Sequence, residues 1–270
     1  DKPNVLIIVA DDLGYSDLGH FGGEIATPNL DRLARQGVTF SSFYTAATCS
    51  PTRAMLLTGV DHHQAGMGNM YEFLPSAPAQ IGKPGYEGFL NDRVVTIAEV
   101  LGEAGYFTGI AGKWHLGRAA EHSPAARGFA KSWVLLDGWA EHFFPGREAG
   151  FARYFREDGR LVDYPQGTYS SEFFTSQLIE YADQAKLQDR PFFLMASYTA
   201  PHWPLQAPPA FLARQRGRYD AGYDRLREQR IAALAERGVV ASVRAPDDVL
   251  PVLHHAPPIL PYRPWTELSD

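Results

Sequence analysis

Apolar residues are grouped into short segments along this chain, and polar residues that could take part in chemistry follow each segment. Residues 5–10 form a continuous apolar run, and residues 106–111 and 191–197 are two mostly apolar segments. Runs of this length are typical of buried strands, and we expect residues 5–10 to be covered on both faces of a sheet. The polar residues that follow would lie at the carboxyl ends of these strands, where open α/β sheets bind their ligands.

Segments with helical periodicity lie between and after these runs. Thr27 and Pro28 predict the start of a helix that stops at Gly37. A second helix is expected over about 94–104, and a third, polar one over about 223–236. The alternation of strands and helices predicts an α/β fold.

Three stretches are predicted to have less regular structure or to lie at the surface. Residues from about 143 to 167 contain several prolines and glycines, which predicts a loop-rich excursion. From about residue 208 to 270 the chain is polar, and residues 246–264 contain six prolines, which predicts an extended connection beyond the third helix. Arg225, Arg227 and Arg230 of that helix are expected on a solvated face.

Composition and charge exclude several classes of protein. Of the 270 residues, 45% are hydrophobic and 21% are charged, as in an ordinary globular domain. The net charge of -6 argues against a nucleic-acid partner, and no apolar run approaches the roughly 18 residues of a membrane span. The first residues do not resemble a signal peptide, so we expect a cytoplasmic protein, or a periplasmic one if the N-terminus was processed.

The single cysteine, Cys49, lies where the sequence predicts the start of a helix. A thiol there would meet free backbone N–H groups and the positive end of the helix dipole, which lower its pKa. The more common role of a lone cysteine is that of a small buried apolar residue. The surrounding string favours the reactive role, because Pro51, Arg53 and residues 57–59, Leu-Thr-Gly, follow it. This pattern resembles the signature of type I, formylglycine-dependent sulfatases.

Two adjacent carboxylates, Asp11 and Asp12, follow the first expected strand. On the turn beyond the strand both can point toward one hard cation, although a simple turn that ends the strand is the more common explanation of an isolated pair. The resemblance implies that Asp11 and Asp12, together with residue 49, are ligands of a calcium ion.

Two further strings follow the other expected strands. Lys113 and His115 lie in Gly-Lys-Trp-His after residues 106–111, and His202 lies in a proline-rich loop after residues 191–197. Taken alone, these residues would be a surface lysine, a structural histidine and a turn histidine. The resemblance implies that Lys113 binds the sulfate, that His115 acts on formylglycine, and that His202 binds the substrate and donates a proton to its leaving group.

The resemblance covers nearly the whole chain and is closest to bacterial arylsulfatases, through residues 22–30, 61–63 and 82–88. It implies a mixed, mostly parallel sheet flanked by helices, as in alkaline phosphatases and sulfatases. No strand-borne Asp-Asn pair follows His202. Residues 1–270 are therefore expected to be the N-terminal part of a single catalytic domain, truncated before its C-terminal part.

The function implied by the resemblance is hydrolysis of sulfate esters, with aryl sulfates as substrates. A formylglycine-generating enzyme would convert Cys49 to 3-oxoalanine (formylglycine), whose hydrate attacks sulfur, while Arg53 anchors residue 49. Two alternatives remain open. One is a phosphonate or phosphate monoester hydrolase of the same superfamily, and the other is an inactive truncated fragment.

Overall fold

The computed structural model describes residues 2–143, 155–241 and 265. The chain divides into two compact units. The first comprises residues 1–13 and 44–208, and the second comprises residues 14–43 and 209–270. The first unit contains the sheet and all residues that the sequence analysis assigns to the site.

The first unit is built on a six-stranded sheet with the order β1-β6-β2-β3-β4-β5. The first four strands in this order are parallel, and β4 and β5 are antiparallel to their neighbours. This is the mixed, mostly parallel sheet that the sequence predicts. The strands are β1 (Val5–Val9), β2 (Phe107–Lys113), β3 (Lys131–Leu135), β4 (Phe155–Glu157), β5 (Arg160–Val162) and β6 (Phe192–Ser197).

The three predicted strands β1, β6 and β2 lie side by side, and their carboxyl ends meet at one edge of the sheet. Ser197 of β6 is opposite Val9 of β1 on one side and Gly112 of β2 on the other. Gly112 has φ +119, and a Cβ there would lie 1.8 Å from the Ser197 carbonyl oxygen. Only glycine permits this approach, which sets the direction in which the chain continues to Lys113.

The expectation that β1 is buried on both faces is wrong. Leu6 is 53% and Ile8 is 47% exposed, whereas Val5, Ile7 and Val9 pack against the core. In the described part of the chain β1 pairs with β6 alone, so it is an edge strand with one covered face.

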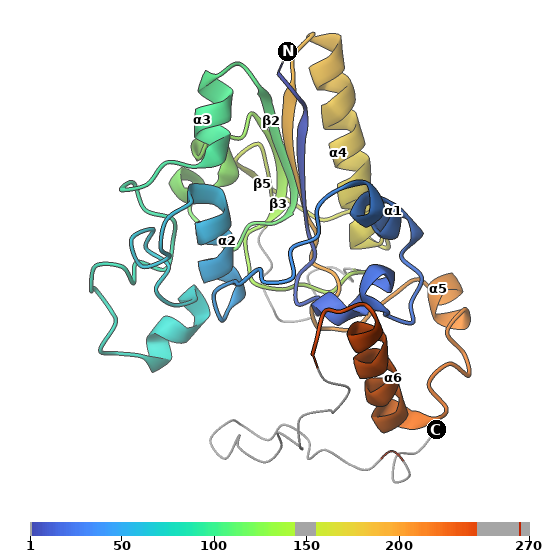
Figure 1. Ribbon diagram of the computed structural model, residues 1–270. Coiled ribbons are helices and arrows are strands. Elements are labelled where there is room, and N and C mark those ends of the chain that lie inside the picture. Colours follow the sequence, from blue (N-terminus) through green and yellow to red (C-terminus); the bar gives the residue numbers. More distant parts are fainter. Residues whose placement is uncertain (1, 144–154, 242–264, 266–270) are drawn as a thin grey trace. The chain divides into compact units, whose positions relative to one another are not determined.

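Helices cover the two faces of the sheet as separate layers, with α2 and α3 on one side and α4 on the other (Figure 1). The alternation of side chains along β2 shows these two layers. Ile110 belongs to the core cluster that includes residues of α2 and α3, and Ala111 belongs to the cluster that includes residues of α4. The α-helices are α1 (Pro28–Gln36), α2 (Cys49–Thr58), α3 (Ile97–Glu103), α4 (Ser170–Leu187), α5 (Pro209–Ala213) and α6 (Gly222–Glu236).

The predicted helices are present with small changes at their ends. Helix α3 begins at Ile97 rather than residue 94, because Thr96 caps it in a reciprocal contact with Glu99. Helices α1 and α6 lie within one residue of their predicted bounds. In the described ranges the structure also has the short 3-10 helices η1 (Tyr15–Asp17), η2 (Gly19–Phe21), η3 (Tyr71–Ser76), η4 (Ala120–His122) and η5 (Pro124–Ala126).

Two predictions about the less regular stretches need correction. The excursion from 143 to 167 contains the β4–β5 hairpin, and its residues 144–154 lie outside the described residues. In the second unit Arg230 is not on a solvated face, since its guanidinium contacts Asp17 and Glu24 and its side chain is 22% exposed. The proline-rich residues 246–264 lie outside the described residues.

Across the described ranges, none of the helices combines the length and the apolar character that crossing a membrane requires.

Candidate active site

A cluster of three buried charged side chains lies at the carboxyl ends of β1 and β2. The Lys113 ammonium is 2.6 Å from Asp11 Oδ2, and Arg53 Nη2 is 3.3 Å from Asp11 Oδ1. Lys113 is 0%, Arg53 3% and Asp11 4% exposed. Burial alone would raise the pKa of Asp11, but the charges of Arg53 and Lys113 lower it below its ordinary value. The cluster therefore places two buried cations around one buried carboxylate, a net positive charge.

Arg53 connects helix α2 to two strands. Its Nη1 donates to the Lys113 carbonyl at 3.0 Å and to Ser197 Oγ at 2.6 Å. Ser197 Oγ in turn donates to the same Lys113 carbonyl at 2.6 Å. Arg53 Nε is buried without a hydrogen-bond acceptor among the described residues. The role of anchor that the sequence suggests for Arg53 is compatible with these contacts, and Ser197 was not predicted, although it ends an apolar run.

Cys49 is the first residue of α2 and is partly buried. Its Sγ lies 3.3 Å from His115 Nδ1 and 3.4 Å from the Met70 sulfur. Burial raises the pKa of the thiol, but the hydrogen bond with His115 and the charge of Lys113 outweigh it, so the pKa is below its ordinary value. The structure thus brings residue 49 into contact with His115 and within the electrostatic influence of Lys113.

His115 is held on both sides of its ring. Its backbone has φ +58, its side chain is buried, and Gly138 leaves room for the ring, since a Cβ there would lie 2.6 Å from His115 Cε1. Nε2 lies 3.0 and 3.2 Å from the two carboxylate oxygens of Glu72. Burial lowers the pKa of His115, but the hydrogen bonds with Cys49 and Glu72 raise it above its ordinary value.

Glu72 is a site residue that the sequence analysis missed. It lies on η3, which has no apolar periodicity and follows no strand, so no local signal marks it. Burial raises the pKa of Glu72, whereas the hydrogen bond from His115 lowers it, and the pKa falls to about 2. The carboxylate is therefore ionised at neutral pH.

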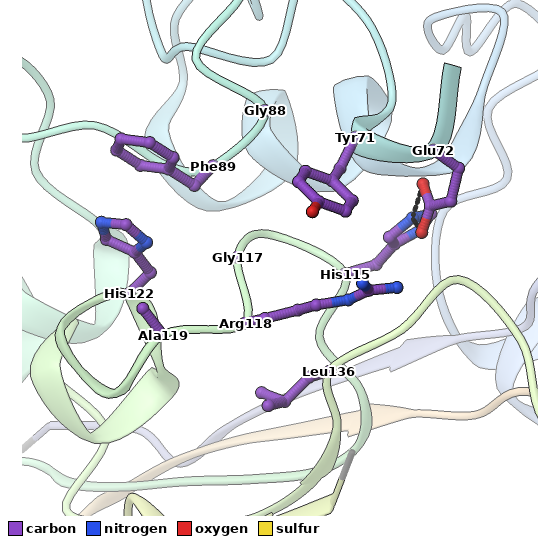
Figure 2. Close-up of a pocket in the computed structure, with 10 residues that line it drawn as sticks. All are labelled: Tyr71, Glu72, Gly88, Phe89, His115, Gly117, Arg118, Ala119, His122 and Leu136. Atoms are coloured by element: carbon purple, nitrogen blue, oxygen red, sulfur yellow. Dashed lines mark hydrogen bonds and ion pairs between the residues drawn. The ribbon is translucent and has the colours of Figure 1, made fainter. Parts of the chain in front are cut away.

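A cavity of about 220 Å³ lies beside His115 and Glu72 (Figure 2). The rings of Tyr71, Phe89 and His122 form much of its lining. Phe89 stacks on His122 with 3.8 Å between ring centres, and the Arg118 guanidinium lies 4.8 Å from the Tyr71 ring centre. The lining residues are Tyr71, Glu72, Gly88, Phe89, His115, Gly117, Arg118, Ala119, His122 and Leu136.

His202 and Asp12 form a second, more exposed pair. His202 Nε2 lies 3.5 Å from Asp12 Oδ2, and Nδ1 lies 2.6 Å from the Trp203 carbonyl oxygen. The carbonyl group of His202 accepts a hydrogen bond from Nε2 of the buried His142, which the sequence analysis also missed. Asp12 has φ +62 and its side chain is 62% exposed. Asp11 and Asp12 thus have different partners despite being adjacent.

The donor chemistry at this edge of the sheet fits part of a calcium site. Carboxylate oxygens are the ligands that calcium prefers, but the ion takes about six to eight of them. Asp11 and Asp12 supply two carboxylates, and Lys113 and Arg53 hold the oxygens of the first. Within the described ranges, the one group of three or more neighbouring candidate ligands is Asp61, His62 and His63, which includes neither aspartate. The residues present therefore fit an incomplete calcium shell.

Comparison with known proteins agrees with the motifs. The Sulfatase family model matches residues 3–246. An uncharacterized sulfatase of Schizosaccharomyces pombe is 45% identical over 262 residues, which are 93% of this chain and 46% of that protein. An arylsulfatase of Klebsiella aerogenes is 43% identical over 244 residues, 89% of this chain and 52% of that protein. The chain thus spans about half the length of these relatives.

Solved structures show the same relationship in three dimensions. The crystal structure of Ps i-CgsB in complex with k-i-k-neocarrahexaose matches with a TM-score of 0.69 and 31% identity, over 88% of this chain and 53% of that one. The structure of BT4656 in complex with its substrate, D-glucosamine-2-N,6-O-disulfate, matches with a TM-score of 0.63 and 26% identity. The match covers 81% of this chain and 38% of that one.

Proposed function

Since the chain belongs to the sulfatase family, we propose that the protein hydrolyses sulfate esters and that aryl sulfates are its substrates. The observation that carries this proposal is the contact of Cys49 with His115 beside two buried cations, Lys113 and Arg53. Buried cations attract a tetrahedral oxyanion, because little water competes with it there.

We propose that Cys49 is oxidised to formylglycine by a formylglycine-generating enzyme. The thiol sulfur, 3.3 Å from His115 Nδ1, then stands in for the oxygen substituents that the modified residue would carry at this position. Formylglycine, as its hydrate, supplies an oxygen nucleophile for the sulfur of the substrate.

The other residues of the site bind the substrate and move protons. Lys113 offsets the negative charge of the sulfate oxygens, and Arg53 holds the start of α2 against β2 and β6. His115 accepts a proton from residue 49. His202, as an imidazolium, donates a proton from Nε2 to the leaving oxygen, while the hydrogen on Nδ1 stays with the Trp203 carbonyl oxygen 2.6 Å away.

We propose Asp11 and Asp12 as two ligands of a calcium ion whose shell also includes residue 49 and oxygens from outside the described residues. A calcium ion bound there would polarise the sulfate group. Asp11 would then contact the ion with an oxygen that now contacts Lys113 or Arg53. The side chains of Lys113 and Arg53 would thereby become available to the anionic substrate.

The cavity beside His115 supports an aromatic leaving group. Tyr71, Phe89 and His122 give it flat, largely apolar walls. A phenyl ring gains from such a surface through burial and stacking, whereas a sugar offers more hydroxyl groups than this lining could satisfy.

A phosphonate or phosphate monoester hydrolase is the second candidate function. Its supporting observation is the same pair of buried cations, Lys113 and Arg53, because an ammonium and a guanidinium bind phosphate oxygens as readily as sulfate oxygens.

Turnover of matched esters decides between the two functions. The protein, produced together with a formylglycine-generating enzyme and supplied with calcium, is assayed with 4-nitrophenyl sulfate, 4-nitrophenyl phosphate and a 4-nitrophenyl phosphonate. We expect kcat/KM to be highest for the sulfate and to fall at least about 100-fold in Lys113→Met, which keeps the length of the side chain and removes its charge. Faster turnover of a phosphorus ester would favour the second candidate.

Lys131→Met is the matched control for this substitution. Lys131 also forms an ion pair, with Asp158 at 2.7 Å, but on β3 and 39% exposed. Its loss should leave kcat/KM unchanged, so an equal fall in both variants would show that Lys113 acts through general stability alone.

A further inference from the structure

The His115 ring has contacts at both nitrogens, and the two partners differ in chemistry. Nε2 faces the two oxygens of the Glu72 carboxylate, at 3.0 and 3.2 Å. Nδ1 faces Cys49 Sγ at 3.3 Å. The ring itself is buried, 5% exposed, and lies over Gly138, so packing leaves it little freedom to turn.

The partner at Nε2 decides which nitrogen carries the hydrogen when the ring is neutral. An ionised carboxylate has only acceptor atoms, so the imidazole must donate to it from Nε2. In the neutral ring the other nitrogen, Nδ1, then carries the lone pair. That lone pair points at residue 49, where a proton acceptor is needed.

We propose that Glu72 is a positioning residue, which fixes His115 in the tautomer with hydrogen on Nε2 and so directs the basic Nδ1 toward residue 49. The proposal rests on the proposed function for the step that it serves, removal of a proton from residue 49. The arrangement itself, from carboxylate to imidazole to residue 49, is present in the geometry independently of that step.

A purely structural role explains the Glu72 contact less well. The Glu72 side chain is 36% exposed, and partly exposed ion pairs contribute little to the free energy of unfolding. Both oxygens of the carboxylate nevertheless face the buried Nε2 of His115. The Arg118 guanidinium and the cavity lie beside this contact (Figure 2). The charge of Arg118 also favours the ionised form of Glu72.

The tautomer can be observed directly by nitrogen NMR. Protein labelled with ¹⁵N-histidine is examined at a pH at which the imidazole is neutral, and the His115 signals are assigned by their loss in His115→Gln. We expect hydrogen on Nε2 in the native protein. In Glu72→Gln that preference should weaken or disappear, because an amide can accept from the ring or donate to it. Hydrogen on Nδ1 in the native protein, or an unchanged tautomer in Glu72→Gln, would overturn the proposal.

Kinetics test whether the tautomer matters for turnover. Glu72→Gln, which preserves shape, should lower kcat for 4-nitrophenyl sulfate about 10–100-fold, as losses of orienting partners commonly do, while KM changes little. Glu87→Gln is the matched control, because Glu87 also pairs with a cation, Arg93 at 2.7 Å, but has no contact with His115. A change in KM with kcat intact would contradict a positioning role.

The two measurements separate this proposal from the proposed function. If the native protein lacks sulfatase activity but shows the expected tautomer and its loss in Glu72→Gln, then the proposed function fails and the positioning role stands. If the protein is an active sulfatase and the tautomer does not depend on Glu72, the positioning role fails alone. Thermal unfolding of each variant shows whether it folds.

Discussion

At the scale of single residues, the candidate site depends on side chains that are distant in the sequence. Cys49 acquires its environment from His115, 66 residues later, and Arg53 contacts Ser197, 144 residues later. The chemistry of each group is therefore a product of the fold, and it can be tested one residue at a time.

The first residue-scale prediction concerns Cys49. In a host with a formylglycine-generating enzyme, peptide mass spectrometry should show the Cys49 peptide about 18 Da lighter, since a thiol is replaced by an aldehyde, a product outside the ordinary cysteine oxidation series. Cys49→Ala should have no sulfatase activity, because no nucleophile remains. A fully unmodified cysteine in soluble protein from such a host would refute the assignment.

The second residue-scale prediction concerns the buried carboxylate of Asp11. Asp11→Asn should lower the free energy of unfolding by about 3–5 kcal/mol, because Lys113 and Arg53 remain buried without their anion. Folding lowers the pKa of Asp11. The contribution of the Asp11 carboxylate to the free energy of unfolding is therefore complete above its ordinary pKa, and it is lost as the pH falls through the folded-state pKa. Calcium affinity should fall as well.

Urea denaturation measures the stability effect, with Asp183→Asn as the control. Asp183 lies on α4 and is exposed, so its loss should cost less than about 0.5 kcal/mol. Equal stability of Asp11→Asn and the native protein would show that the three buried charges do not depend on one another.

At the scale of helices and strands, the sequence predicted what local patterns specify. Strands β1 and β6 have apolar runs, β2 has a mostly apolar one, and α1 and α6 have clear ends. Strand β3 was missed because it begins with two polar residues, Lys131 and Ser132. Helix α4 was missed although its buried positions, among them Phe174, Leu178 and Tyr181, recur at helical spacing.

Some residues of the candidate site could likewise be predicted from local patterns, and others could not. Residues that follow a predicted strand, such as Asp11, Lys113 and His115, could be placed at one edge of the sheet, because parallel strands end together. Glu72 and His142 could not, since Glu72 lies on a short 3-10 helix and His142 in a turn, and neither follows a predicted strand. Their positions depend on tertiary contacts that leave no periodic pattern in the sequence.

A prediction at this scale concerns Arg230, which joins α6 to residues 17–24 in the second unit. Its guanidinium contacts Asp17 and, at 2.8 and 3.0 Å, the two oxygens of Glu24. Arg230→Ala should destabilise the protein by about 1–3 kcal/mol, as loss of charge-assisted hydrogen bonds does. Arg225→Ala is the control, since Arg225 is 60% exposed and pairs only with Glu228 among the contacts described for it.

The pH dependence of this contact follows from Glu24. Burial raises the pKa of Glu24, but the hydrogen bonds from Arg230, the backbone and Tyr219 lower it to about 2 from an ordinary value of 4.5. The stabilisation is therefore complete above pH 4.5 and is lost as the pH falls toward 2. Thermal unfolding from pH 6 to 2.5 should show a smaller decline for Arg230→Ala than for the native protein, and parallel curves would contradict the assignment.

At the scale of the whole molecule, the fold class and the family were predictable because motifs occur at the ends of successive strands. The relationship covers 93% and 89% of the chain but only 46% and 52% of two relatives. In the described residues β1 has an unpaired edge and two exposed apolar side chains, Leu6 and Ile8. An open, apolar edge strand favours association between copies.

We therefore expect a purified chain of these 270 residues to self-associate. Sedimentation velocity should show species larger than the monomer, and Leu6→Lys should reduce them, because a charge on the strand opposes pairing. Leu187→Lys is the control, since Leu187 is 87% exposed but lies at the end of α4. A monodisperse monomer would contradict this expectation.

The burial of helix α2 has a consequence for the order of events during synthesis. Pro51 and Arg53, which follow Cys49 in its sequence motif and which we take to be read by the maturation enzyme, are buried in the folded chain. A maturation enzyme could read them only before α2 packs, and Arg53 gains its Ser197 partner 144 residues later. The ribosome adds about 5–20 residues per second, so the 144 residues from Arg53 to Ser197 take roughly 7–30 seconds to synthesise, and the maturation enzyme has this time to act. Enzyme added after folding should therefore leave Cys49 unmodified.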